Sequence, residues 1–180
     1  MRRWLVAVNE RAGASPVPVD RVRGSLDAAG VDYDLQTPRG LPELTELITE
    51  EAKSGRDHFC VVGGDGTVNA LVNVLMSLDL GIRPTIGVLP AGTGCDLLRT
   101  FGIPQDLGPA ARHLLGDQVY AIDVPYLEGE WGMRHFVNVA QAGVGAAAAQ
   151  SAPRLSRRLG SGRYPLAFAA RLPRFPRGNV

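Results

Sequence analysis

With 180 residues, 45% of them hydrophobic and 21% charged, the chain has the composition of a globular protein, and its length suits one domain or one domain and the start of a second. The apolar run Trp4–Val8 is too short for a signal peptide, and no stretch approaches the roughly 20 apolar residues that a membrane-spanning helix needs. The formal net charge is +1, and Cys60 and Cys95 lack the spacing of zinc ligands, so we expect free thiols and a cytoplasmic protein.

The first part of the chain is predicted to alternate strands with helices. Short apolar or alternating runs indicate strands, and apolar residues that recur every three or four positions indicate helices. Gly30 and Gly55 are predicted to end two of the helices. The predicted order is a strand at 4–8, a helix at 19–29, a strand at 31–36, a helix at 41–52, a strand at 58–62, a helix at 68–78, a strand at 85–89 and a helix from 96. This alternation predicts the α/β class, with an open parallel sheet and helices on both faces.

The pattern changes near residue 119. Residues 119–127 and 134–140 are predicted as consecutive strands, and the turn-like Glu128-Gly129-Glu130 between them indicates an antiparallel hairpin. We therefore expect residues 1–118 to form an α/β domain and residues 119–180 to form an incomplete β-rich second domain with a basic C-terminal segment. In that segment, residues 146–149 and 155–172 are predicted to be helical, the second stretch being broken around Pro165.

Charge is unevenly distributed along the chain. Residues 131–180 contain eight arginines and no Asp or Glu, whereas residues 1–130 hold 11 basic and 18 acidic residues. A basic segment of this kind could make peripheral contact with anionic lipid at the inner face of a membrane. The alternative is that its acidic partners lie elsewhere in the protein, and both interpretations stay open. We expect no nucleic-acid partner.

The strongest chemical signal is residues 58–73, with the sequence HFCVVGGDGTVNALVN. A buried strand leads into Gly63-Gly64-Asp65-Gly66-Thr67, and an amphipathic helix follows directly. Glycines let the backbone approach a ligand closely, and the N–H groups and dipole of a helix N-terminus favour phosphate. Asp65 could bind Mg²⁺ carried by a triphosphate, while Thr67 and Asn69 could position a phosphate. Alternatively, Asp65 or Thr67 could simply cap the helix.

A second glycine-rich turn favours nucleotide binding. The predicted strand 85–89 leads into Ala91-Gly92-Thr93-Gly94-Cys95-Asp96, where the next helix begins. Two such turns, at the carboxyl ends of neighbouring strands, would converge where ligands bind in open α/β sheets. Helix capping by chance does not predict that pairing. Neither turn is a P-loop, since no Gly-Lys-Ser/Thr follows, and neither has the spaced dinucleotide fingerprint.

These two motifs, VGGDGTVNALVN at 62–73 and IGVLPAGTGCDLLRTFGIP at 86–104, resemble the catalytic domain of diacylglycerol kinases, which bacterial lipid kinases, sphingosine kinases and ceramide kinases share. The resemblance covers roughly residues 4–145. It implies transfer of the γ-phosphate of ATP, with Mg²⁺, to the hydroxyl of a lipid alcohol such as diacylglycerol. By position, it implies metal contact through MgATP at Asp65 and nucleotide contacts at Asn9, Gly13, Thr37, Gly63, Gly64, Asp65, Gly66, Thr67, Val68, Asn69, Gly92, Thr93 and Asp96.

The chain also departs from the family pattern. Glu10 replaces a loop proline, Cys95 replaces the usual asparagine, and the run Gly143-Val144-Gly145-Ala146 lacks an acidic residue. Members of the family take metal ligands and a catalytic carboxylate from a β-rich second domain, and residues 131–180 contain no carboxylate. We therefore predict an ATP-binding half that is a weak or inactive kinase alone, and we identify no catalytic base in it.

Two other functions stay open. One is an NAD kinase, which also uses the GGDGT turn, although the run Gly92–Asp96 follows the lipid-kinase pattern. The other is a non-catalytic nucleotide-binding or regulatory module, which would account for the missing carboxylates.

Overall fold

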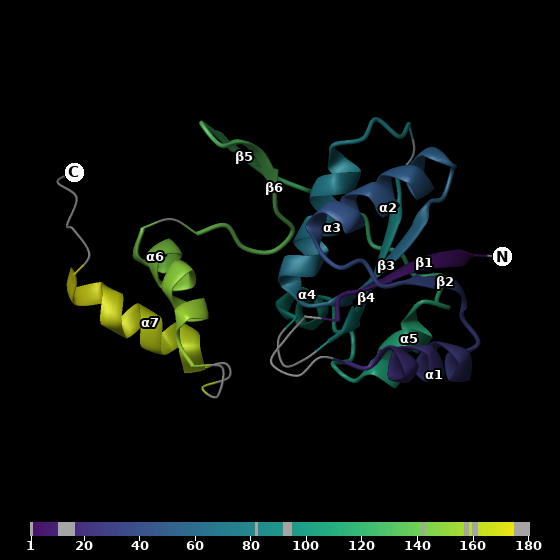
Figure 1. Ribbon diagram of the computed structural model, residues 1–180, viewed down its shortest axis with the longest axis horizontal. Helices are drawn as coiled ribbons and strands as arrows, with labels where there is room; N and C mark the ends of the chain where they lie inside the picture. Colours follow the sequence, from purple (N-terminus) through teal and green to yellow (C-terminus); the bar gives the residue numbers. More distant parts are fainter. Residues whose placement is uncertain are drawn as a thin grey trace. The chain divides into compact units, whose positions relative to one another are not determined.

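The computed structural model describes residues 2–10, 17–81, 83–91, 95–141, 143–156, 159 and 162–174 (Figure 1). The chain divides into two compact units, Met1–Asn138 and Val139–Val180.

The first unit is built on a parallel sheet of four strands in the order β2-β1-β3-β4. Leu5 of β1 lies opposite Phe59 of β3, and Gly63 at the end of β3 lies opposite Pro90 of β4. The strands are β1 Arg3–Val8, β2 Asp32–Gln36, β3 His58–Gly63 and β4 Thr85–Pro90. Because all four are parallel, the loops that follow them leave the sheet at one edge. The predicted α/β class is confirmed.

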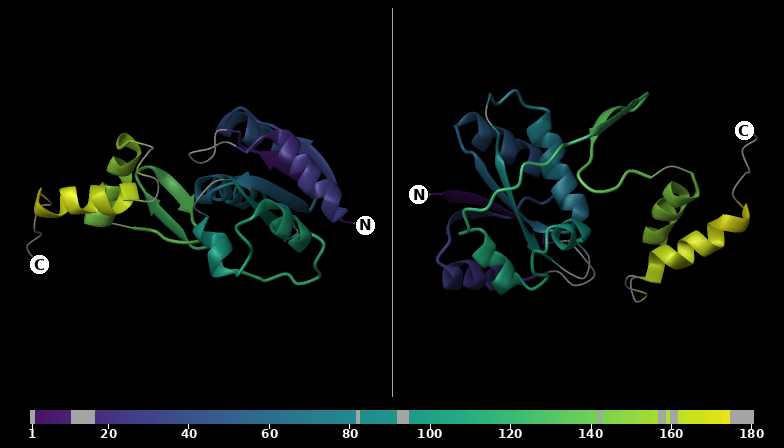
Figure 2. Two further views of the ribbon diagram at one scale, coloured as in Figure 1. Left: turned by 90° about the horizontal axis from the view of Figure 1, so that it is seen from below. Right: turned by 180° about the vertical axis from the view of Figure 1, so that it is seen from behind.

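Helices cover both faces of this sheet. Helices α2 and α3 lie on one side, and α1 and α5 lie on the other, as the opposite views in Figures 1 and 2 show. The bounds are α1 Val19–Ala29, α2 Leu41–Lys53, α3 Asp65–Met76, α4 Asp96–Thr100 and α5 Leu107–His113. Since the chain leaves β1 toward one face and β3 toward the other, these two neighbouring strands form the point where ligands bind in such sheets.

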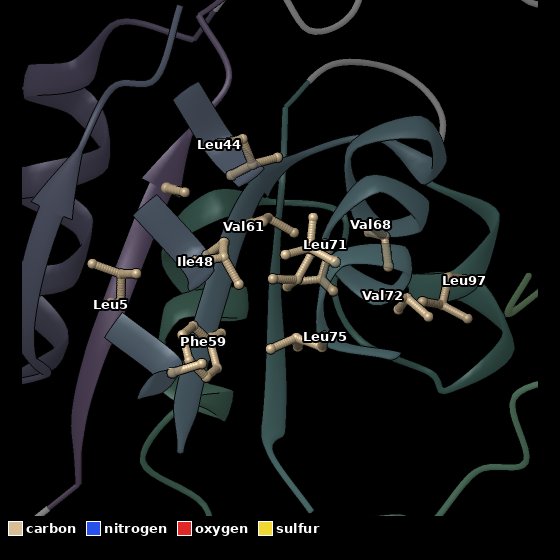
Figure 3. Packing of buried hydrophobic residues seen from close by; sticks show 14 of the residues in the cluster. Leu5, Leu44, Ile48, Phe59, Val61, Val68, Leu71, Val72, Leu75 and Leu97 are labelled. Carbon is tan, nitrogen blue, oxygen red and sulfur yellow. The ribbon is translucent and has the colours of Figure 1, made fainter. Parts of the chain in front are cut away.

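Two apolar clusters hold the layers together. On one face, Ile48 of α2 and Leu71 of α3 pack against Phe59 and Val61 of β3 (Figure 3). On the other face, the cluster joins α1 and α5 to the remaining side chains of β1 and β3. Strands β1 and β3 are buried almost throughout, which explains their continuous apolar sequences.

Two helices of the first unit differ from the prediction. Helix α3 begins at Asp65 rather than at residue 68, so part of the GGDGT turn is itself the first turn of the helix. Helix α5 follows Asp106 and was not predicted. Gly30, with φ 77°, and Gly55, with φ 96°, follow their helices as expected.

The predicted hairpin is present but shorter. Its strands are β5 Tyr126–Gly129 and β6 Gly132–His135, and Gly129 pairs with Gly132 around the turn Glu130-Trp131. The prediction of strand over residues 119–125 and 136–140 was wrong, since these residues lie outside β5 and β6, although the Pro125 carbonyl still accepts the N–H of Phe136 at 3.0 Å. The hairpin belongs to the first compact unit, and a second domain that starts near residue 119 stays a prediction.

The second unit consists of short helices. These are α6 Val144–Ser151, the 3₁₀ helix η1 Ala152–Arg154, α7 Arg163–Arg171 and the 3₁₀ helix η3 Leu172–Arg174. Pro165 lies in the first turn of α7, where no N–H is needed, so the helix begins just before the proline instead of being broken by it. Within the described parts of the chain, no helix is long and apolar enough to cross a membrane.

Candidate nucleotide-binding site

The loops after three neighbouring strands are joined just beyond the sheet. The backbone N–H of Asn9, after β1, donates to the carbonyl of Val62 at 3.0 Å, and the N–H of Ala91, after β4, donates to the carbonyl of Gly63 at 3.2 Å. The sheet register therefore continues one residue into the loops. These bonds place Asn9 and Ala91, where the first loop and the second glycine-rich turn begin, beside the end of β3.

A side-chain bond links the first loop to the first glycine-rich turn. The Asn9 side-chain amide donates from Nδ2 to the Thr67 hydroxyl oxygen at 2.9 Å, and the contact is partly buried. It lies where β1 and β3 send the chain to opposite faces of the sheet. The Thr67 hydroxyl keeps its own proton as a donor for a phosphate oxygen.

Asp65 links the two glycine-rich turns. Its Oδ2 accepts the backbone N–H of Asp96 at 3.1 Å, and its Oδ1 accepts the backbone N–H of Leu97 at 3.1 Å. These are the first N–H groups of α4, which no carbonyl inside that helix can satisfy. A carboxylate beside the positive end of a helix dipole is also favourable. Asp65 thus acts as a cap for α4, supplied from a distant part of the sequence.

The alternative interpretation, in which Asp65 or Thr67 caps α3 with its side chain, is wrong. Its N-cap is Gly64, with no side-chain cap bond, and the Gly64 carbonyl accepts the N–H groups of Thr67 and Val68. Among the described residues, the N–H groups of Asp65 and Gly66 have no hydrogen-bond acceptor. They remain available to an anion at the start of a 12-residue helix.

Cys95 contributes a third donor to Asp65. Its thiol lies 3.6 Å from Asp65 Oδ1, and the residue is only 2% exposed. Burial, with a smaller contribution from the Asp65 charge, raises the pKa of the Cys95 thiol to about 11, so the proton stays on sulfur at neutral pH. The cysteine that departs from the family's asparagine therefore still offers a donor to this carboxylate, although a weaker one.

The glycines of the first turn have different physical roles. A Cβ at Gly63 would lie 2.4 Å from the Thr67 hydroxyl oxygen and 2.6 Å from its Cβ, so this glycine makes room for Thr67. A Cβ at Gly66 would meet nothing within 4 Å, and Gly66 is exposed. Gly66 is therefore the glycine whose missing side chain leaves open space beside the free N–H groups.

Two of the predicted contact residues lie farther along α3. Val68 is 1% exposed and packs in the core, so only its backbone could meet a nucleotide. Asn69 is exposed, and its Oδ1 lies 3.3 Å from the side-chain nitrogen of Asn73. Asn73 was not predicted as a functional residue. The sequence did contain a signal for it, since two asparagines four positions apart lie on the same face of a helix.

The remaining residues predicted to contact the nucleotide have no described bond to the start of α3 through their side chains. Thr37 is exposed at the end of β2 and lines an open hollow of about 180 Å³ with Gln36, Pro38, Glu43 and Leu47. The exposed Asp96 carboxylate pairs with Arg99 at 2.6 Å. The predicted contacts Gly13, Gly92 and Thr93 lie outside the described residues.

The described residues do not gather a set of metal ligands of their own. Within the described ranges, no three or more His, Cys, Asp or Glu side chains gather as metal ligands. Both Asp65 oxygens already accept backbone N–H bonds, although each has a further lone pair. This arrangement fits an Mg²⁺ ion that arrives with nucleotide phosphates, as that ion prefers, rather than a protein cage. Metal contact at Asp65 stays a prediction.

Comparison with known proteins shows which family the chain resembles. Residues 3–127 match the sequence model of the diacylglycerol kinase catalytic domain. The chain is 37% identical over 164 residues to a protein named Probable lipid kinase YegS-like from Chromohalobacter salexigens, covering 91% of this chain and 51% of that protein. It is 32% identical over 146 residues to diacylglycerol kinase from Bacillus subtilis, covering 79% and 46%.

A solved structure shares the fold. The crystal structure of a diacylglycerol kinase from Bacillus anthracis matches with a TM-score of 0.57 and 32% identity, over 68% of this chain and 42% of that one. The chain spans about half the length of the curated relatives that it matches.

Proposed function

The chain belongs to the diacylglycerol kinase catalytic domain family, and from this premise we propose that it binds MgATP at the carboxyl edge of its sheet for phosphoryl transfer to a lipid hydroxyl. The observation that carries the proposal is the bonding of the Asp65 carboxylate to the backbone N–H groups of Asp96 and Leu97. This contact holds the two glycine-rich turns together. A site of this kind gives a polyphosphate two backbone turns to bind.

In this proposal, the phosphates lie against the open start of α3. The N–H groups of Asp65 and Gly66 and the hydroxyl of Thr67 are the donors, and Asn9 orients that hydroxyl through its 2.9 Å bond. Asn69, Thr37, Gly13, Gly92, Thr93 and Asp96 are proposed as further contacts. When bound, Mg²⁺ would offset negative charge on the phosphates.

The proposed acceptor is a lipid alcohol such as diacylglycerol. Phosphoryl transfer depends mostly on positioning and charge stabilisation, but the hydroxyl proton must pass to a base. Asp65 is engaged with two N–H groups and Asp96 pairs with Arg99. Residues 131–180 contain no carboxylate, so we propose that this chain alone binds the nucleotide well and transfers phosphate slowly.

The direct test measures binding and transfer separately. Titration calorimetry with MgATP should give saturable binding, with ADP weaker and NAD weaker still. Radiolabelled γ-phosphate should then appear in a lipid extract of diacylglycerol micelles at a low rate. Absence of MgATP binding would overturn the proposal, whereas preferential binding and phosphorylation of NAD would support the NAD kinase alternative. Binding with no transfer to any lipid would favour the regulatory module, which the engaged carboxylates also support.

We also propose that the second unit contacts anionic membrane. In α7 and η3, Leu166 and Leu172 are 50% and 55% exposed, and Arg163 and Arg171 lie on the same segment. No acidic residue is present in residues 131–180. Apolar side chains beside arginines suit the surface of an anionic bilayer. Sedimentation should show stronger binding to vesicles with 30% phosphatidylserine than to neutral vesicles, and equal binding would contradict the electrostatic contribution.

A further inference from the structure

Asn73 forms a closed pair of hydrogen bonds with one residue of the hairpin. The backbone N–H of His135 donates to Asn73 Oδ1 at 2.9 Å, and Asn73 Nδ2 donates to the carbonyl of His135 at 2.9 Å. These residues lie 62 positions apart, on α3 and on β6. The contact is partly buried.

The strand register explains why His135 needs such a partner. Phe136 N–H donates to the Pro125 carbonyl at 3.0 Å, so Phe136 and Pro125 are a hydrogen-bonded pair of the hairpin. In an antiparallel ladder the next pair, Tyr126 with His135, is then a non-hydrogen-bonded one. The N–H and C=O of His135 therefore point away from β5, at the open edge of β6. Asn73 satisfies both groups.

Asparagine suits this position because its primary amide has the same donor and acceptor as a peptide group. The Asn73 side chain, which comes from a helix, therefore bonds to His135 as the backbone of a neighbouring strand would. Two further bonds hold the amide in place, since Nδ2 also donates to the Asn69 carbonyl at 2.8 Å and lies 3.3 Å from Asn69 Oδ1. Asp65, Asn69 and Asn73 are spaced four apart, so they share one face of α3. This polar face extends from the glycine-rich turn to the hairpin.

We infer that Asn73 is a positioning residue that fixes the hairpin β5–β6 to α3, and so ties the hairpin to the nucleotide turn at the start of that helix. The inference rests on the proposed function for its relevance to phosphoryl transfer, but the attachment itself does not require a bound nucleotide. A two-stranded hairpin is marginal alone, and this one exposes Tyr126, Leu127 and Met133. Among the described residues, the side-chain hydrogen bonds given between α3 and the hairpin are the two that the Asn73 amide makes with His135.

Hydrogen exchange on the nucleotide-free protein tests the attachment. In Asn73→Leu, which keeps the side-chain size but removes both hydrogen-bonding groups, the peptide 126–136 should exchange about tenfold faster than in the wild type. Exchange in β1 and β3 should change less than twofold. Asn138→Leu, an equal substitution at an exposed asparagine, is the control and should leave the hairpin unchanged. Unchanged hairpin exchange in Asn73→Leu would overturn the inference.

A second variant separates positioning from general loss of packing. In Asn73→Asp, the ionised carboxylate accepts from the His135 N–H but repels its carbonyl, so protection should fall at pH 7. Once protonated, below about pH 4, the carboxyl again has one donor and one acceptor, so protection should return toward that of the wild type at the same pH. If protection stays lost at pH 3.5, the two-bond attachment is wrong.

Added MgATP tests the link to the nucleotide turn. Saturating MgATP should slow exchange of peptide 126–136 about threefold or more in the wild type and leave it unchanged in Asn73→Leu, while both proteins bind ATP within about threefold of each other. Should the wild type bind MgATP without any change in the hairpin, the link is refuted. If the wild type does not bind MgATP, the proposed function fails, and the nucleotide-free experiment still decides the attachment.

Discussion

The two ends of the four-stranded sheet use their polar side chains in opposite ways. At the amino end, side chains pair with one another: Arg56 binds Glu51 at 2.6 Å and Asp34 at 2.8 Å, and Arg3 binds the same Asp34 through Nε at 2.9 Å. Every charge in this group has a charged partner. The group therefore stabilises the junction of β1, β2 and the start of β3 without offering a site to a ligand.

At the carboxyl end, side chains instead hold backbone. Asp65 binds the first N–H groups of α4, and Asn9 binds Thr67, so the described parts of the loops are joined by hydrogen bonds to backbone and hydroxyl groups. The N–H groups at the start of α3 are left for an anion. The comparison teaches that the carboxylate of Asp65 organises the two turns, while the backbone amides at the start of α3 are the groups that we propose for phosphate binding.

The largest expected effect is that of Gly63→Ala, because it disturbs both stability and the site. The new Cβ would lie 2.4 Å from the Thr67 hydroxyl, which must then release Asn9. Overpacking of this kind costs about 1–3 kcal/mol, and we expect the upper part of that range in urea unfolding. The double variant with Thr67→Gly, which also removes the Thr67 Cβ that would lie 2.6 Å from the new methyl group, should recover part of the loss. A single variant as stable as the wild type would contradict the tight packing at this turn.

Gly66→Ala should separate binding from stability. Alanine is favoured over glycine inside a helix by roughly 0.5–1 kcal/mol, and a Cβ here meets nothing within 4 Å, so the protein should be as stable as before or more so. The added methyl group would nevertheless occupy the space beside the free N–H groups. We expect MgATP affinity in calorimetry to fall about tenfold or more, which corresponds to about 1.4 kcal/mol.

Gly108→Ala is the matched control for that variant. Gly108 is the second residue of α5, as Gly66 is of α3, and its Cβ also meets nothing within 4 Å. It should raise stability similarly and leave ATP affinity unchanged. An equal loss of affinity in both variants would mean that the open start of α3 is not where phosphate binds.

These sites show what the sequence could and could not predict. The alternation of apolar runs and glycines predicted the sheet, its strands and the meeting of two turns at one edge, because parallel strands end together. The partner of Asp65 could not be predicted, since the carboxylate bonds to backbone 31 and 32 positions away, and any residue there offers the same N–H. The structural role of Gly63 likewise depends on the position of Thr67. The first predicted strand of the hairpin was too long, because the apolar residues from 119 onward that suggested a strand are exposed in the structure and do not pair.

Asp65→Asn should change stability less than Gly63→Ala does and MgATP affinity less than Gly66→Ala does, and its effect should be greatest at the start of α4. The variant keeps one acceptor oxygen, but its NH₂ group would face a backbone N–H of α4. Loss of a cap and its charge costs about 1 kcal/mol, and exchange of the Asp96 and Leu97 amides should increase. MgATP affinity should fall by about three- to tenfold. Cys95→Ser, which keeps a donor to this carboxylate, is the control and should change both quantities little.

The smallest effect is expected at the amino end, and it should appear only in acid. The hydrogen bond from Arg3, with Arg56 adding to it, holds the pKa of Asp34 below its usual value against a smaller opposing effect of burial. His58 lowers the pKa of Asp57 in the same way. A carboxyl whose pKa is lower in the folded state stabilises the fold above its unfolded pKa, near 4, and this stabilisation is lost as the pH falls through the folded value.

Asp34→Asn should therefore make the free energy of unfolding depend less steeply on pH below about 4, measured by urea unfolding between pH 2 and 7. At pH 7 the variant should lose little free energy of unfolding, since the Asp34 and Arg3 side chains are 31% and 57% exposed and solvent screens such pairs. MgATP affinity at pH 7 should not change, because none of these charges lies at the edge of the sheet that we propose binds phosphate. A clear loss of affinity in Asp34→Asn would mean that the amino-end ion pairs also shape the nucleotide site, and the separation of roles between the two ends of the sheet would not hold.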